Sequence, residues 1–252
     1  MLEISNKAKI GQNVKIYPFV YIEDDVEIGD DCVIYPNVCI MNGTKIGKGN
    51  KIFQNTVLGA EPQDFNYMGC PSKVVIGDNN IIRENVVINR GTCEGGVTEI
   101  GNNNIIMEGT HISHDTKVGN RCVFGYGSKI AGDCDIDDYV IFSSNVIINP
   151  EVRIGCSVMI QSGCRVSKDV PPYIVAVDNP IRYGGLNPEI LAARGVSDKV
   201  RKHIANSYRI VFNGGTSLED AILQISEQVQ QDPEVIVVRK FIENTKLGIV
   251  GR

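Results

Sequence analysis

The sequence has no tryptophan, only three histidines and no apolar run near the roughly 20 residues that span a bilayer. Its N-terminus, MLEISNKAKIGQNV, lacks the charged and then apolar pattern of a signal peptide. We therefore expect a cytoplasmic protein with no stable membrane insertion. A formal net charge of -5 also disfavours nucleic acid as a partner, because contacts to phosphates need a concentrated basic surface.

The cysteines and histidines form no recognisable metal motif. None of the eight cysteines lies in a CxxC pair, and the third histidine, His203, is far along the chain from the other two. We therefore expect no bound metal. Four cysteines recur at one position of the repeat described next, which indicates small buried thiols: Cys32, Cys122, Cys134 and Cys164.

A six-residue repeat occupies the first two thirds of the chain. An aliphatic residue recurs at every sixth position from Ile10 to Leu58, and the apolar phase returns at Ile76 and runs, with one further interruption, to Val166. A period of six fits neither an amphipathic helix, with a period of about 3.6, nor a two-faced strand, with a period of about 2. It is typical of the hexapeptide β-helix, in which three hexads form a triangular coil and residues 18 apart lie above one another. We predict a mainly β fold, a parallel β-helix, over residues 1–186.

Two segments break the rhythm: AEPQDFNYMGCPSKV at residues 60–74 and CEGGVT at residues 93–98. We expect both to loop out, and loops on a rigid scaffold often carry binding residues. The repeat ends near KDVPPYIV, residues 168–175, because paired prolines remove backbone donors. Residues 187–252 follow as a small C-terminal α-helical domain, whose helices we expect to begin at four capping residues: Asn187, Ser197, Thr216 and Asp232.

The stretch MEGTHISHDTKVGN, residues 107–120, contains both remaining histidines. His114 follows a core position and precedes Asp115, and a carboxylate can fix the imidazole tautomer of a general base. Gly132 lies one coil beyond His114, where its N–H could stabilise an oxyanion. The pattern predicts an acyl-transfer site formed by His114, Asp115 and Gly132. The alternatives are that the histidines are solvated turn residues and that Gly132 only permits a tight turn.

Four motifs resemble the UDP-N-acetylglucosamine acyltransferases that begin lipid A synthesis, and the resemblance covers nearly the whole chain. They are IRENVVINRGT (82–92), GNNNIIMEGTHISHDTKVGNRC (101–122), KDVPPYIV (168–175) and GLNPEILAARG (185–195). The resemblance implies a left-handed β-helix and a homotrimer with active sites between neighbouring subunits. It also implies transfer of a fatty acyl group, often 3-hydroxylated, from acyl carrier protein to the 3-position of the UDP-sugar. The carrier thioester is the donor, and no further cofactor is expected.

By the same resemblance, His114 is the general base, Asp115 its partner and the Gly132 N–H the oxyanion donor. Ser162 and Pro180 occupy positions along the acyl-chain groove. The implied contacts to the UDP-sugar are Gln63, Asp64, His111, Asn187, Glu189 and Arg194. Arg194 suits a diphosphate, although a cation at a helix C-terminus is also favoured on electrostatic grounds.

Several positions depart from the family pattern. A histidine is usual at Asp133, a His-Gln pair at Asn149 and Pro150, a lysine at Asn66 and a second arginine at Ala193. Because the base, carboxylate and glycine remain, we expect a changed acceptor or a divergent paralogue, with a 3-amino UDP-sugar as one hypothesis. The alternatives are a CoA-dependent acetyl- or succinyltransferase and a non-catalytic binder of UDP-sugar or carrier protein. Because acyl carrier proteins are acidic, we also expect a basic docking surface among Lys129, Arg153, Arg165 and Lys168.

Overall fold

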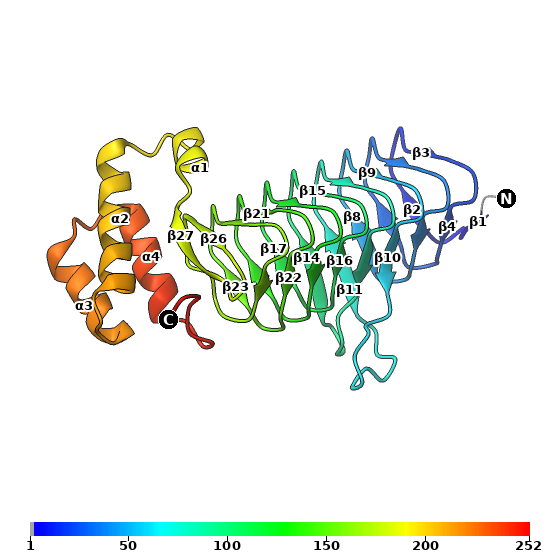
Figure 1. The fold of residues 1–252 in the computed structure, drawn as a ribbon. Coiled ribbons are helices and arrows are strands. Elements are labelled where there is room, and N and C mark those ends of the chain that lie inside the picture. Colours follow the sequence, from blue (N-terminus) through cyan, green and yellow to red (C-terminus); the bar gives the residue numbers. More distant parts are fainter. Residues whose placement is uncertain (1–2) are drawn as a thin grey trace.

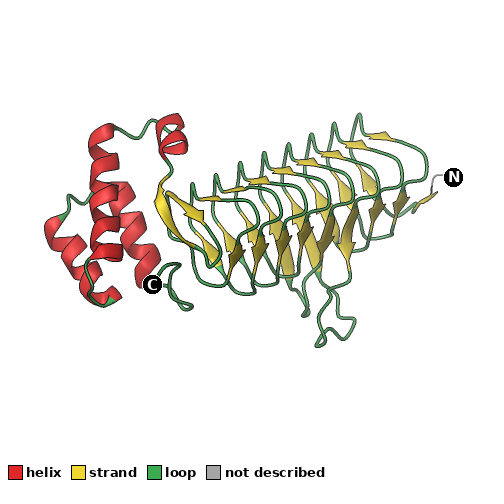
Figure 2. Ribbon diagram, viewed as in Figure 1, coloured by secondary structure: helices red, strands yellow, loops and turns green. Residues whose placement is uncertain are grey.

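The computed structural model describes residues 3–252 as a long prism of short strands with a bundle of helices at one end (Figures 1 and 2). Three sheets form the sides of the prism, and their strands are parallel except for the last strand of one sheet. Sheet A contains β1 (Glu3–Ile4), β4 (Tyr21–Ile22), β7 (Cys39–Ile40), β10 (Val57–Ala60), β13 (Val87–Asn89), β16 (His111–Ile112), β19 (Lys129–Ile130), β22 (Ile147–Ile148) and β25 (Arg165–Val166). Sheet B contains β2 (Lys9–Ile10), β5 (Glu27–Ile28), β8 (Thr44–Ile46), β11 (Lys73–Ile76), β14 (Val97–Ile100), β17 (Lys117–Val118), β20 (Asp135–Ile136) and β23 (Arg153–Ile154). Sheet C contains β3 (Lys15–Ile16), β6 (Val33–Ile34), β9 (Lys51–Ile52), β12 (Ile81–Ile82), β15 (Ile105–Ile106), β18 (Val123–Phe124), β21 (Ile141–Phe142), β24 (Met159–Ile160), β26 (Ile174–Val177) and β27 (Arg182–Leu186).

The register follows the predicted 18-residue coil, since His111 pairs with Lys129 and Ile112 with Ile130. The prediction of a left-handed hexapeptide β-helix is confirmed. Three hexads form one coil because each two-residue strand directs its second residue inward and then turns. Many of these turns place an asparagine or aspartate at a backbone φ near +60°, a conformation that these residues tolerate best after glycine.

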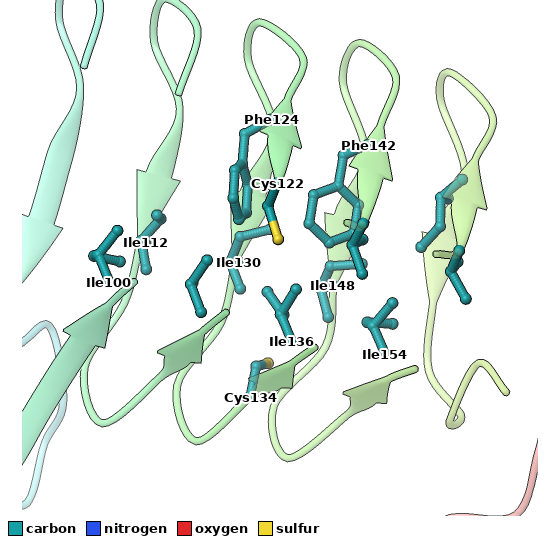
Figure 3. Close-up of a cluster of buried hydrophobic side chains, with 14 of the residues drawn as sticks. Ile100, Ile112, Cys122, Phe124, Ile130, Cys134, Ile136, Phe142, Ile148 and Ile154 are labelled. Atoms are coloured by element: carbon teal, nitrogen blue, oxygen red, sulfur yellow. The ribbon is translucent and has the colours of Figure 1, made fainter. Parts of the chain in front are cut away.

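The core is the column of inward residues, which includes the periodic aliphatic residue of a hexad and, four positions later, a smaller side chain such as Cys32 or Val38. Figure 3 shows the isoleucines of successive coils stacked inside the prism, beside Phe124 and Phe142, whose ring centroids are 4.9 Å apart. The recurring cysteines are buried as predicted. Ile10 is an exception among the periodic residues, because it lies near the N-terminal end, where few coils cover it, and remains 38% exposed. Burial of each inward isoleucine stabilises the fold by about 1.5–3 kcal/mol before entropic costs.

The series of two-residue strands ends before the two prolines, but strand pairing in sheet C continues past them. Pro171 and Pro172 precede β26, which pairs with β24 in parallel and with β27 in antiparallel fashion. The prolines remove donors only at the turn, so β26 keeps its own.

Four helices follow: α1 (Pro188–Ala193), α2 (Asp198–Asn213), α3 (Leu218–Gln228) and α4 (Pro233–Glu243). Ser217, not Thr216, caps α3, and Asp232 precedes α4 without a side-chain cap bond. The bundle packs on the end of the prism through buried Tyr208, whose hydroxyl donates to Pro172 O at 2.5 Å. No helix within residues 3–252 is both long and apolar enough to cross a membrane.

Candidate active site

The predicted catalytic residues lie at one edge of the prism, in the turns that follow strands β16 and β19 of sheet A. Ser113 N donates to Ile130 O, and Asp133 N donates to His114 O at 3.1 Å, so the ladder holds the two neighbouring turns together. Asp115 has a φ of 54°, which places it at the left-handed position of its turn. The hexad turn therefore brings His114, Asp115 and Gly132 together from two successive coils.

Asp115 is fixed from several directions. Its Oδ2 lies 3.1 Å from His114 Nδ1 and accepts from both the N–H and the hydroxyl of Thr92, at 2.9 and 2.8 Å. Its own N–H donates to Thr98 Oγ1 at 2.9 Å. Because a carboxylate can only accept, Nδ1 of His114 carries the hydrogen and Nε2 is left as the basic nitrogen. Sequence reasoning missed Thr92 and Thr98, since nothing in the hexad phase marks them.

Gly132 faces the ring of His114. A Cβ atom at this glycine would stand 2.5 Å from His114 Nε2 and 2.8 Å from Nδ1, closer than side-chain atoms pack. Within residues 3–252, the Gly132 N–H has no hydrogen-bond acceptor. The glycine thus leaves room for the imidazole and leaves one donor free beside it.

The segment of residues 60–74, the first excursion from the repeat, brings Asp64 close to His114. Its Oδ2 lies 3.8 Å from His114 Nε2, and its Oδ1 accepts from Asn66 N at 2.7 Å. The excursion begins at a bulge at Gly59, where φ is +77° and a Cβ would overlap Thr44 Oγ1. Gln63 is exposed beside Asp64.

Arg90 anchors that loop. Its guanidinium donates to the Tyr67 hydroxyl at 2.9 Å and pairs with Glu61 at 3.2 Å. Tyr67 in turn lies three residues beyond Asp64, so the clamp restrains the segment that carries the carboxylate. Figure 1 shows the loop between β10 and β11 extending away from the prism, and its tip carries two exposed apolar side chains, Phe65 and Met68.

Two further titratable groups near His114 have shifted pKa values. Burial lowers the pKa of His111, and the charges of Lys129 and His114 act in the same direction. Partial loss of solvent raises the pKa of the Asp133 carboxyl, while His114 acts against that shift.

The three residues of the C-terminal domain that the resemblance implies as sugar contacts lie away from His114 within the chain. The Asn187 side chain caps α1 and donates to Ser157 O at 3.2 Å. Arg194 donates to Ser157 Oγ at 2.7 Å and lies over the ring of Tyr139, 4.9 Å from its centroid. Glu189 is exposed. Within residues 3–252, none of the three hydrogen-bonds to His114 or Asp64.

The groove and docking candidates are also dispersed. Pro180 lines a cavity of about 690 Å³ together with Arg165, Lys168 and Arg252, whereas Ser162 is exposed outside it. Arg153 instead donates to Asn244 O at 3.0 Å and holds the helical bundle to the prism. No cluster of histidine, cysteine or carboxylate side chains in residues 3–252 has the arrangement of a metal site.

Comparison with known proteins gives matches along the chain. The second-domain model of the UDP N-acetylglucosamine O-acyltransferases matches residues 169–250, and the bacterial transferase hexapeptide model matches residues 7–42, 25–60 and 98–132. An acyl-[acyl-carrier-protein]–UDP-N-acetylglucosamine O-acyltransferase from Pseudomonas entomophila (strain L48) is 39% identical over 247 residues, which is 98% of this chain and 96% of the relative.

Solved structures agree over the same span. A UDP-N-acetylglucosamine acyltransferase from Bacteroides fragilis 9343 is 47% identical with a TM-score of 0.97, covering 99% of this chain and 98% of the other. The UDP-N-acetylglucosamine acyltransferase of Francisella novicida is 38% identical with a TM-score of 0.95, covering 99% and 92%.

Proposed function

The chain belongs to the UDP-N-acetylglucosamine O-acyltransferase family, and from that premise we propose how its site works. The protein is an acyltransferase that moves a fatty acyl group from acyl carrier protein to UDP-N-acetylglucosamine, the first step of lipid A biosynthesis. The observation that carries the catalytic assignment is the placement of His114 between Asp115 and Gly132.

In the proposed reaction, Nε2 of His114 removes the proton from the 3-hydroxyl of the sugar as that oxygen attacks the thioester carbonyl. A C–O bond forms, and the Gly132 N–H donates to the resulting oxyanion. The C–S bond then breaks, and the His114 imidazolium returns its proton to the departing thiolate. Asp115 stabilises the imidazolium throughout. The thioester supplies the activated acyl group, so the reaction uses no separate cofactor.

We propose that the working unit is a homotrimer in which the tail of one subunit serves the site of another. The support is geometric, because Arg194 lies at Tyr139, on the turn between β20 and β21, whereas His114 follows β16 in sheet A. Glu189 makes no side-chain hydrogen bond or ion pair within residues 3–252, so it is free to meet a neighbour. A mixture of co-refolded His114→Ala and Glu189→Ala subunits should recover activity that neither variant has alone.

For the carrier protein, the cavity beside Pro180 is the proposed docking region. Arg165, Lys168 and Arg252 are the charged residues that line it, which suits an acidic partner. Replacing Arg165 and Lys168 with glutamate should raise KM for the carrier and leave KM for the sugar unchanged. Because the donor is a carrier protein and the acceptor a nucleotide sugar, we propose that the reaction takes place in the cytoplasm.

A 3-amino UDP-sugar is the second candidate acceptor. Asp133, where the family usually has histidine, adds a carboxylate to the surroundings of His114 that already include Asp64 and Asp115. That concentration of negative charge favours an acceptor bearing an amine. Comparing kcat/KM for the 3-hydroxy and 3-amino sugars decides between them.

The test of the main assignment is acyl transfer from 3-hydroxyacyl carrier protein to UDP-N-acetylglucosamine. We expect His114→Ala to lower kcat by roughly 100- to 10,000-fold, the usual contribution of a general base. A variant that keeps more than half of the wild-type rate would remove His114 from the mechanism.

A further inference from the structure

Asn89 connects the substrate loop with His111. It is the last residue of β13 and is completely buried. Its Nδ2 donates to Glu61 O at 2.7 Å and to Ala60 O at 3.4 Å, at the start of the loop that carries Asp64. On its other side, Oδ1 lies 2.5 Å from His111 Nε2.

These contacts fix the orientation of the amide. Glu61 O and Ala60 O are carbonyl oxygens and can only accept, so the NH₂ group of Asn89 must face them. The amide oxygen therefore faces His111, and it too can only accept. Nε2 of His111 must consequently carry a hydrogen, which leaves Nδ1 without one in the neutral ring.

The surroundings of His111 also oppose protonation of the ring. The side chain is partly buried, and burial lowers its pKa. Lys129, its partner in the β16–β19 ladder, lowers the pKa further, and so does His114 when its ring is protonated. Within residues 3–252, Nδ1 of His111 has no hydrogen-bond partner.

We propose that Asn89 is a positioning residue that holds His111 in the Nε2–H tautomer, so that Nδ1 accepts a hydrogen bond from a hydroxyl or amide N–H of the acceptor sugar. The identity of the sugar rests on the proposed function, whereas the tautomer rests on the contacts of Asn89 alone. His114 has the opposite tautomer because Asp115 contacts its Nδ1. Two histidines three residues apart thus have different roles: His114 is the base through Nε2, and His111 is an acceptor through Nδ1.

The same amide couples the ring to the loop. Because one side chain contacts both His111 and the carbonyls that precede Gln63 and Asp64, a change at Asn89 alters two parts of the sugar site together. It leaves the Asp115 and Thr92 contacts of the base in place.

Nitrogen NMR of protein labelled with ¹⁵N-histidine tests the tautomer directly, since the chain has only three histidines. The spectrum of His111→Gln lacks one set of histidine signals, and that set is thereby assigned to His111. We expect wild-type His111 to give the neutral Nε2–H pattern at pH 7. A neutral Nδ1–H pattern or an imidazolium in the wild type would overturn the proposal without any variant being made.

Asn89→Asp supplies the second measurement. The aspartate sets an oxygen against the two carbonyls and a negative charge beside Nε2, so His111 should become an imidazolium near neutral pH. An imidazolium cannot accept at Nδ1, and KM for the UDP-sugar should rise roughly tenfold, as expected for one lost hydrogen bond. KM for the carrier should not change.

Asn104→Asp is the matched control. Asn104 is equally buried, accepts from Cys122 N and donates to Gly119 O, but touches no histidine. It should lower Tm while leaving the His111 spectrum and KM for the sugar unchanged. If Asn89→Asp only lowers Tm in the same way, Asn89 is structural and the proposal fails. Correct His111 spectra in a protein that transfers no acyl group would instead count against the proposed function.

Discussion

The ring of His114 occupies the space that a side chain on Gly132 would need, with Nε2 only 2.5 Å from the position of a Cβ atom. The two residues are 18 apart, so the hexapeptide register alone places them in successive coils of the same edge. The 18-residue period of the fold therefore places the base His114 beside the backbone donor of Gly132.

Gly132→Ala should lower kcat at least about 100-fold, because the methyl group displaces the imidazole and disturbs the oxyanion donor. Steady-state acyl transfer measures it. Gly125→Ala is the control, since a Cβ there meets the backbone of Ser143 and no catalytic side chain. Equal loss of kcat per folded molecule in both variants would mean that the effect is a general distortion of the coils and not the contact with His114.

Thr92→Val should lower kcat by roughly threefold to tenfold. The change removes the hydroxyl that donates to Asp115 Oδ2 at 2.8 Å and keeps the backbone donor at 2.9 Å, so the carboxylate loses one of its two donors from Thr92. Thr92→Ser keeps the hydroxyl and should retain the wild-type rate. A serine variant as slow as the valine variant would show that keeping the hydroxyl does not preserve the rate, and the effect could not be assigned to the hydrogen bond.

The periodic part of the site could be predicted from the hexad phase, whereas Asp64 was indicated only by the family resemblance. His114, Asp115 and Gly132 follow from the hexad phase, because a strict repeat converts sequence separation into stacking. Asp64 approaches His114 only because of the bulge at Gly59, and residues 60–72 have no period from which that approach could be read.

The contacts made by Asn89 show a second limit of prediction from the sequence. The hexad phase gave no reason to assign this residue a role different from that of the other buried polar side chains. Its partners, Glu61 and His111, are 28 and 22 residues away, and neither separation is a whole number of 18-residue coils. The role of Asn187 as a sugar contact stays a prediction of the resemblance; within the chain its side chain caps α1 and donates to Ser157 O.

Arg90→Met should raise KM for the UDP-sugar roughly tenfold with a smaller effect on kcat. The variant loses the bonds to the Tyr67 hydroxyl and Glu61, so the loop that carries Asp64 is no longer restrained. Hydrogen exchange of residues 60–72 should become faster. Arg83→Met is the comparison, because Arg83 lies over the Phe53 ring, 4.7 Å from its centroid, outside the loop. Unchanged exchange in Arg90→Met would exclude the clamp.

His111→Gln should make the stability of the protein less dependent on pH below neutrality. The folded pKa of His111 lies below the usual value of about 6.5, so the unfolded chain binds a proton first as the pH falls. Wild-type stability is therefore lost as the pH drops through about 6.5 towards the lower folded pKa, and this contribution is absent in the glutamine variant. Tm measured at pH 8 and pH 5.5 should fall more in the wild type.

Lys129→Gln gives an intermediate test of the same linkage. Removing this positive charge takes away one cause of the lowered pKa of His111 and leaves burial, which is the larger cause, in place. The loss of Tm between pH 8 and pH 5.5 should then lie between those of the wild type and His111→Gln. If the wild type and His111→Gln lose equal Tm on acidification, His111 takes up its proton as readily in the folded state as in the unfolded chain, and the lowering of its folded pKa would have to be abandoned.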